Sequence, residues 1–275
     1  MPYEDVLIRN NVRVVGSGQQ IIVLAHGFGC DQQMWRFLLP YLGNDYTLVL
    51  FDYVGSGASH LGAYSKQKYE TLEGYAQDII DICQTLDLYN VHLVGHSVSG
   101  IISLLVAQKI AARINSLIMV CPSPCFLNIP PDYFGGFEEQ DLKELMDLMD
   151  KNYIGWAHYL APLVTGEEEN SSLTTELSDS FCSTNPLTAK TFAKATFFSD
   201  HRASLPLNQH PVLLLQSAND SLAAVSIGEY MHNHTPNSSL KVIAAQGHCL
   251  HMSHPEKVAN AIKAFLPTIH TDCKL

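Results

Sequence analysis

The sequence lacks any apolar run near the roughly 20 residues that span a bilayer, and it has no basic and apolar segments typical of a secretory leader. Basic residues are few: 16 Lys and Arg against 27 Asp and Glu give a net charge of −11, and no basic patch is visible. This charge balance disfavours nonspecific attraction to nucleic acid or to anionic membranes. We therefore expect a protein with no nucleic-acid partner and no membrane partner.

The seven cysteines are odd in number and lack the paired spacing of a structural zinc site. Without a leader in the sequence, they predict reduced thiols in a cytoplasmic protein. Cys30 and Cys249 lie beside motifs described below and could sense oxidation, but small buried thiols are the commoner interpretation. With 275 residues and 47% hydrophobic content, the chain can bury one large core and carry a smaller appendage.

Short apolar runs alternate with helical patterns along most of the sequence. The helical spacing is clearest over residues 71–86, which lead into an apolar run that ends before Ser97. The other predicted strands are residues 12–15, 20–25, 46–51, 116–120, 211–216 and 240–244. Strands that alternate with helices predict an α/β fold, with a mostly parallel sheet flanked by helices.

This alternation breaks between residues 124 and 196, where no buried strand is evident. Residues 138–149 have helical periodicity, and Pro130-Pro131 and Gly135-Gly136 mark turns before them. We expect a helical cap, residues 124–196, inserted into a core formed by residues 1–123 and 197–275. Most aromatic residues of a small cap would form its own core, and Phe126 and Trp156 are the best candidates for a pocket.

Ser97 lies in the run GHSVSG (95–100), where an apolar strand meets a turn of small residues and then a helical pattern. This arrangement is typical of a nucleophile elbow, which exposes a serine oxygen for attack on a carbonyl carbon. The second glycine of the G-x-S-x-G pattern is replaced by Ser99, whose small side chain still suits a tight turn. Ser97 is therefore the candidate nucleophile.

A serine nucleophile needs a base and an acid that orients the base. His248 follows the last predicted strand and Asp220 follows the strand before it, so the order serine, acid, histidine is that of the α/β-hydrolases. His251 and His254 continue a spacing of three that could be mistaken for a metal-ligand set. Glycine and proline bracket that segment, and we expect no metal. Asp52 also follows a strand, but it precedes the serine, and we interpret it as structural.

Backbone N–H groups must also face the oxyanion that develops during attack. The predicted strand 20–25 leads into His26-Gly27-Phe28-Gly29, whose glycines permit a positive φ. We predict that the N–H groups of Phe28 and Val98 form the oxyanion hole.

These motifs resemble those of the α/β-hydrolase superfamily and, within it, of the RsbQ-type hydrolases of bacterial stress signalling. The resemblance covers nearly the whole chain and rests on GFGCDQ (27–32), FDYVGSG (51–57), SPCFLN (123–128), YFGGFEE (133–139), NYIGW (152–156), FFSDHR (197–202) and GHC (247–249). The plant karrikin and strigolactone receptors are related, and GHSVS (95–99) is similar to their version of the elbow.

The resemblance implies a cap of four helices over an apolar pocket, and a triad of Ser97, His248 and Asp220 kept in a signalling regulator of a stress response. It also implies a PAS-domain phosphatase as protein partner. We expect no cofactor. A pocket roofed by aromatic residues suggests a small hydrophobic ester, lactone or enol ether as ligand. Two alternatives remain open: a sensor like the plant receptors, and a metabolic carboxylesterase with brisk turnover.

Overall fold

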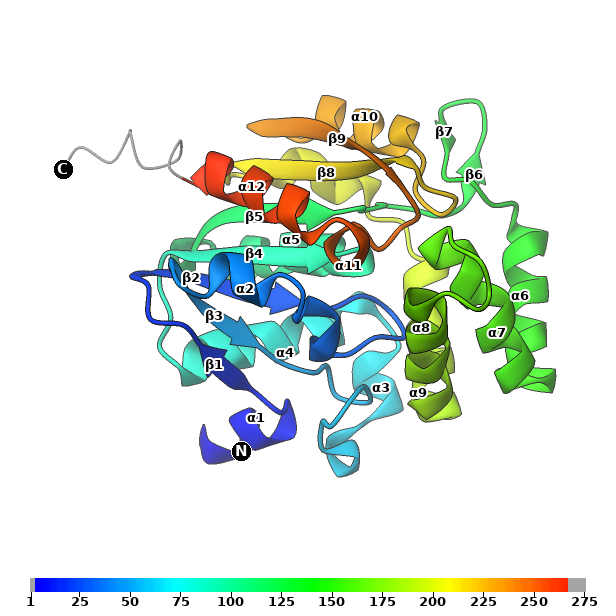
Figure 1. Ribbon diagram of the computed structural model, residues 1–275, viewed down its shortest axis with the longest axis horizontal. Helices are drawn as coiled ribbons and strands as arrows, with labels where there is room; N and C mark the ends of the chain where they lie inside the picture. Colours follow the sequence, from blue (N-terminus) through cyan, green and yellow to red (C-terminus); the bar gives the residue numbers. More distant parts are fainter. Residues whose placement is uncertain (1–2, 267–275) are drawn as a thin grey trace.

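Seven strands form the central sheet in the order β1-β3-β2-β4-β5-β8-β9 (Figure 1). The computed structural model describes residues 3–266, so the ends of the predicted core, residues 1–2 and 267–275, lie outside them. β1 pairs antiparallel with β3, and the other neighbours are parallel. The predicted α/β fold with a mostly parallel sheet is confirmed. The strands are β1 (Arg13–Val15), β2 (Gln20–Ala25), β3 (Tyr46–Leu50), β4 (Val91–His96), β5 (Ile114–Val120), β8 (Val212–Asn219) and β9 (Ser238–Gln246).

Successive residues of the central strands face opposite sides of the sheet, and this produces two apolar cores. In β4, Val94 packs into one core and Leu93 into the other, and in β5 Ile118 and Leu117 divide in the same way. Both faces of these strands are buried, which is why they are continuous apolar runs in the sequence rather than alternating ones.

Helices cover both faces of the sheet (Figure 1). Side chains of α2 and α12 pack into the core on one face, and those of α4 and α5 into the core on the other. The helices of this part of the chain are α1 (Tyr3–Arg9), α2 (Leu39–Leu42), α3 (Lys66–Tyr69), α4 (Leu72–Thr85), α5 (Val98–Lys109), α10 (Val225–His234), α11 (Leu250–Ser253) and α12 (Pro255–Phe265). Within residues 3–266, no helix combines the length and apolar character that a membrane span requires.

The last two strands extend further than the predicted runs 211–216 and 240–244. Parallel pairing continues through polar residues, and Asn219 of β8 is still paired with Gln246 of β9. Apolar patterning could not indicate this extension, because these end residues are partly exposed. The two strands therefore end directly at Asp220 and Gly247.

Four helices lie together at one end of the sheet (Figure 1): α6 (Glu139–Lys151), α7 (Tyr153–Thr165), α8 (Ser172–Ser183) and α9 (Pro186–Phe197). A hairpin of two very short strands, β6 (Asn128–Ile129) and β7 (Tyr133–Phe134), precedes them. α7 packs against α6 and α8, and α6 packs against α9. These elements occupy the segment predicted as a cap, and α9 ends one residue beyond its boundary.

Asp78 of α4 is a buried carboxylate that connects several segments. One of its oxygens accepts hydrogen bonds from Lys68 Nζ and Tyr69 Oη, both at 2.8 Å, and lies 3.5 Å from Arg9 Nη2. The other oxygen accepts from the backbone N–H of Val54 at 3.1 Å. The amide of Asn10 also donates to this second oxygen, at 3.2 Å. The side chain of Asp78 is fully buried, so these hydrogen bonds and ion pairs take the place of water around its charge.

Replacement of Asp78 by alanine should lower the free energy of unfolding by about 3–5 kcal/mol, because it leaves the buried donors of Tyr69, Asn10 and Val54 without their acceptor. Arg9 then keeps one carboxylate partner, Asp81 at 2.8 Å. Urea denaturation measures the change. The matched control is Asp45→Ala, which removes the half-exposed partner of Lys263 and should cost less than about 1 kcal/mol. Equal losses of unfolding free energy in the two variants would contradict the stabilising role of the buried Asp78 carboxylate.

Candidate active site

Ser97 occupies a sharp turn between β4 and α5. Its backbone has φ 56° and ψ −125°, a conformation that is rare for a residue other than glycine and that is found at strained functional turns. The N–H of Ser97 donates to the carbonyl of Val120 at 2.8 Å, which ties the turn to β5. The chain thus reverses direction within one residue, as a nucleophile elbow requires.

The neighbours of Ser97 explain the residue types of the motif. A Cβ added to Gly95 would lie 2.2 Å from the carbonyl oxygen of Ser99, so only glycine fits there. At the second glycine position, Ser99 Oγ donates to the carbonyl of His26 at 2.5 Å and lies 2.9 Å from Tyr53 Oη. The departure from the usual pattern therefore adds a link between the elbow and the loop that follows β2.

Asp220 and His248 form a buried hydrogen-bonded pair. His248 Nδ1 lies 2.7 Å from Asp220 Oδ2, while Asp220 Oδ1 accepts from the backbone N–H groups of Leu222 at 2.9 Å and Ala223 at 3.0 Å. Burial alone would raise the pKa of the Asp220 carboxyl, but the opposite charge of His248 and these hydrogen bonds together lower it. Asp220 is therefore a carboxylate that holds the imidazole by one nitrogen.

The other imidazole nitrogen of His248 is unpartnered, and the residue lines a small cavity. His248 Nε2 is buried and has no hydrogen-bond partner. The cavity, about 30 Å³ in volume, is lined by His248 together with Ser97 and Phe28. With Nδ1–H directed at the carboxylate, Nε2 carries the free lone pair that a general base needs. The structure thus brings the three predicted triad residues to one place, where chain segments 28 to 151 residues apart meet.

Of the two predicted oxyanion donors, Phe28 lines the same cavity, and Val98 directly follows the lining residue Ser97. Val98 is the first residue of α5, so its N–H belongs to the helix-terminal donors that have no acceptor within the helix. Phe28 lines the cavity, and the next residue, Gly29, has φ 72°. The carbonyl of Gly29 accepts from Ser180 Oγ of α8 at 2.8 Å, so a cap helix also holds this loop. The oxyanion role of Phe28 and Val98 stays a prediction.

The two pocket residues predicted from the sequence differ in position. Phe126 lines the cavity beside Ser97, but Trp156 does not. Trp156 is buried behind the lining, with its ring 5.9 Å from that of Phe28 and 5.2 Å from that of Phe181. Trp156 therefore packs against the lining residues and does not itself line the cavity. The sequence could not distinguish these two positions, because a helical residue beside a pocket can face either the pocket or the helices behind it. Phe181 of α8, one of the aromatic residues of the predicted cap, lines the cavity as well. The sequence missed other lining residues from three cap helices: Leu160 and Val164 of α7, Leu177 of α8, and Thr196 and Phe197 of α9.

Loops that carry Asp220 and His248 bind the end of cap helix α7. Ser221 Oγ donates to the carbonyl of Leu163 at 2.6 Å, and the N–H of His248 donates to the carbonyl of Val164 at 2.7 Å. Carbonyls in the last turn of a helix have no partner within the helix, so these loops satisfy them. The position of the cap and the position of the base are therefore mechanically coupled.

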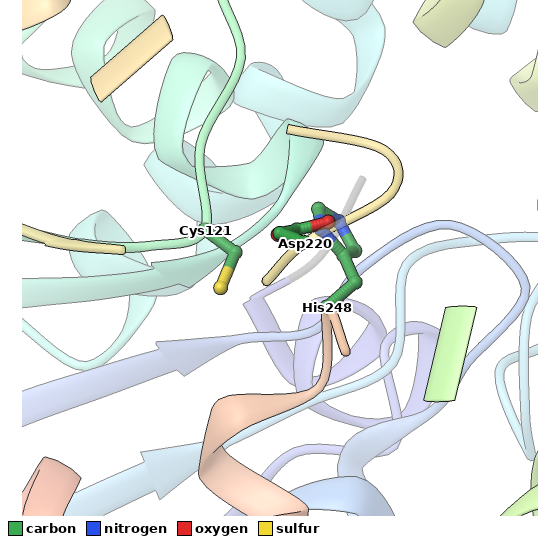
Figure 2. A group of neighbouring side chains, drawn as sticks. All are labelled: Cys121, Asp220 and His248. Carbon is green, nitrogen blue, oxygen red and sulfur yellow. The ribbon is translucent and has the colours of Figure 1, made fainter. Parts of the chain in front are cut away.

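Cys121 is a third side chain at the Asp220–His248 pair (Figure 2). One potential metal-ligand atom from each of the three residues lies within 4.8 Å of the others. Burial, and then the charge of Asp220, raise the pKa of the Cys121 thiol, which opposes the thiolate form that zinc binds. His248 Nδ1 and Asp220 Oδ2 are also at hydrogen-bond distance, 2.7 Å apart. The geometry thus favours an acid–base pair with a neutral thiol beside it.

His251 and His254, the other members of the spacing-of-three pattern, do not join this group. The ring of His251 lies 4.6 Å from that of Trp35 and 4.4 Å from that of His96. His96 lines the same cavity as Ser97, and its Nε2 lies 3.0 Å from the carbonyl oxygen of His248. Buried imidazoles thus pack beneath the base.

The architecture and the site define a class of protein. The family described as "alpha/beta hydrolase fold" matches residues 20–255 of this chain. The chain therefore belongs to the α/β-hydrolase family, and the prediction of a hydrolase is confirmed.

Individual relatives narrow the comparison. The chain is 39% identical over 251 residues to a probable esterase of Oryza sativa subsp. japonica, and the match covers 90% of this chain and 92% of that protein. It is 37% identical over 264 residues to "Karrikin insensitive 2 receptor CA" of Petunia hybrida, with 96% of each covered. A solved hydrolase from Oleispira antarctica has 54% identity and a TM-score of 0.95, and the match covers 97% of this chain and 98% of that one. The narrower RsbQ-type assignment stays a prediction.

Replacement of Ser99 by alanine should lower kcat by about 10- to 100-fold with little change in KM, because it releases the oxyanion loop from the elbow. The matched control is Ser103→Ala, which removes another buried hydroxyl of α5 bonded to the carbonyl of Ser99 at 2.7 Å. That variant does not touch His26 and should retain kcat. Ester hydrolysis under saturating conditions measures both, and equal losses would reduce Ser99 to a packing role.

His251 should make the protein less stable in acid. Burial, and then the charge of His248, lower the pKa of His251 from 6.5 to about 3, so the unfolded chain binds the extra proton. The stability contribution is complete above about pH 6.5 and falls by roughly 1.4 kcal/mol per pH unit as the pH drops toward 3.

The comparison of wild type with His251→Phe and His251→Gln tests this expectation, because neither variant takes up the proton. Denaturation between about pH 7 and 4.5 should give a shallower pH dependence in both variants. Curves parallel to that of wild type would show that His251 does not titrate on unfolding.

Proposed function

We propose that the protein hydrolyses a small apolar ester or lactone through Ser97, His248 and Asp220. The observation that carries this proposal is the unpartnered Nε2 of His248, a residue that lines the same cavity as Ser97 and whose Nδ1 is held by Asp220. A serine, a free base nitrogen and a fixed tautomer are the requirements of acyl transfer.

In the proposed reaction, Ser97 Oγ attacks the acyl carbon and His248 Nε2 takes the hydroxyl proton. The N–H groups of Phe28 and Val98 stabilise the oxyanion, and the bond from the acyl carbon to the alcohol oxygen then breaks as His248 returns the proton to that oxygen. Water attacks the acyl group on Ser97 in a second cycle, with His248 again as base. Asp220 keeps the imidazole in one tautomer throughout and stabilises its charged form.

The lining of the cavity favours an apolar ligand. Phe28, Phe126, Phe181 and Phe197 face it together with leucine and valine side chains, and the polar lining groups include Ser97 and His248. Binding would then depend on burial of apolar surface, with the reactive carbonyl placed by few polar contacts.

We further propose that turnover is slow and that the protein regulates a stress response in the cytoplasm, as the RsbQ-type resemblance implies. The bonds from the Asp220 and His248 loops to α7 support this proposal, because a group bound at the base would change the position of the cap. The karrikin receptor among the relatives adds support. The protein partner would be a PAS-domain phosphatase, as in the RsbQ-type pathway. A metabolic esterase with brisk turnover is the alternative, which the esterase name of the rice relative favours.

Hydrolysis of 4-nitrophenyl acetate should depend on the triad. Ser97→Ala should lower kcat by at least about 10³-fold, and Asp220→Asn by about 10⁴-fold, since an amide supports the wrong tautomer. Release of nitrophenolate measures both rates, and circular dichroism controls for folding. Full activity in folded Ser97→Ala would overturn the proposed mechanism.

The turnover rate on the preferred substrate distinguishes a slow regulatory hydrolase from a metabolic esterase. A panel of aryl esters and butenolides should give wild type a fast first turnover, followed by only a few turnovers per hour. Proteolysis of the cap should change when the site is acylated and should not change in Ser97→Ala. Sustained rates near 10 s⁻¹, about the median of enzymes, would instead favour the metabolic esterase.

A further inference from the structure

A second and larger cavity adjoins the one at Ser97. This outer chamber has a volume of about 520 Å³, while the inner cavity has about 30 Å³, room for one or two water molecules. Both cavities are lined by Leu160, Phe197 and Leu222. These three side chains therefore form the wall between the chamber and the site.

One residue of this wall lies in the turn beside Asp220, and the other two belong to cap helices. Leu222 donates its N–H to Asp220 Oδ1 at 2.9 Å, so it lies in the turn that holds the acid. Leu160 belongs to α7 and Phe197 to α9. A substrate with its acyl carbon at Ser97 would extend past this wall into the outer chamber, because the inner cavity is too small for both halves of an ester.

The lining of the outer chamber is apolar with a negative rim. Leu145, Leu148 and Leu163 contribute apolar surface, while Asp141 and Glu144 of α6 contribute carboxylates. The described lining contains no lysine, arginine or histidine. The recorded hydrogen-bond partners of the two carboxylates are uncharged, the backbone N–H of Glu138 for Asp141 and the amide of Gln140 for Glu144.

We propose that the outer chamber is the subsite for the alcohol half of the ester, and that Glu144 and Asp141 select neutral or cationic alcohols against anionic ones. The inner cavity limits the acyl half to about the size of an acetyl group. The preferred substrates are therefore short-acyl esters of apolar alcohols that carry no negative charge. This inference rests on the proposed hydrolysis at Ser97. The alcohol, protonated by His248, leaves through the chamber.

Three aryl acetates that differ in charge test the subsite: 4-tert-butylphenyl acetate, its cationic isostere 4-(trimethylammonio)phenyl acetate, and anionic 4-carboxyphenyl acetate. Glu144→Gln keeps the shape of the side chain and removes its charge. Ratios of kcat/KM between charged and neutral esters, compared between variant and wild type, cancel the intrinsic reactivity of each ester.

In Glu144→Gln, the anionic-to-neutral ratio should rise about five- to tenfold, and the cationic-to-neutral ratio should fall by a similar factor. Both changes should shrink at high ionic strength. The matched control is Asp147→Asn, the same loss of charge on α6 at an exposed residue outside the chamber lining. This control should keep the wild-type ratios.

Two different failures can be told apart in the same assay. If wild type hydrolyses the neutral ester and Ser97→Ala does not, the proposed function stands; unchanged ratios in Glu144→Gln would then overturn the subsite alone. Equal shifts in Asp147→Asn would also overturn it, since they would reflect net charge. If hydrolysis does not depend on Ser97, the proposed function fails and the subsite falls with it.

Discussion

The hydrogen bond from His248 Nδ1 to Asp220 Oδ2 determines how the rest of the site is used. It occupies Nδ1, and so it leaves Nε2, which has no hydrogen-bond partner, as the nitrogen of His248 that is free to accept a proton. Two backbone N–H groups anchor the other oxygen of Asp220, so the acid cannot turn away. Without this bond, Ser97 would share its cavity with an imidazole of undefined orientation.

Further hydrogen bonds near this pair link the core of the protein to the cap helices. Ser99 joins the turn at Ser97 to the loop that follows β2, and Ser180 joins that loop to α8. The turns after β8 and β9 cap the carbonyls of α7. The core and the cap are thus connected by hydrogen bonds around Ser97, Asp220 and His248.

The apolar runs of the sequence predicted the sheet. The sequence also predicted that Ser97, Asp220 and His248 lie at one site, because all three follow parallel strands, whose carboxyl ends meet at one edge of the sheet. It could not orient the cap helices, since amphipathic spacing does not say which apolar face meets a pocket. Trp156 was therefore misplaced, and Leu160 and Phe197 were missed. From the sequence, Ser99 was interpreted only as a tolerated substitution for glycine. Its hydrogen bond to His26 could not be predicted, because the two residues are 73 positions apart in the chain. The outer chamber depends on how α6, α7 and α9 pack, which no local pattern encodes.

Intact-protein mass after reaction with an active-site phosphonate tests the central claim most directly. The account predicts one adduct on wild type, mapped to the peptide that contains Ser97, with no adduct on folded Ser97→Ala. Asp220→Asn should form the same adduct far more slowly, because the serine is then without a correctly oriented base. An unmodified wild type, or equal labelling of Ser97→Ala, would contradict the assembled triad.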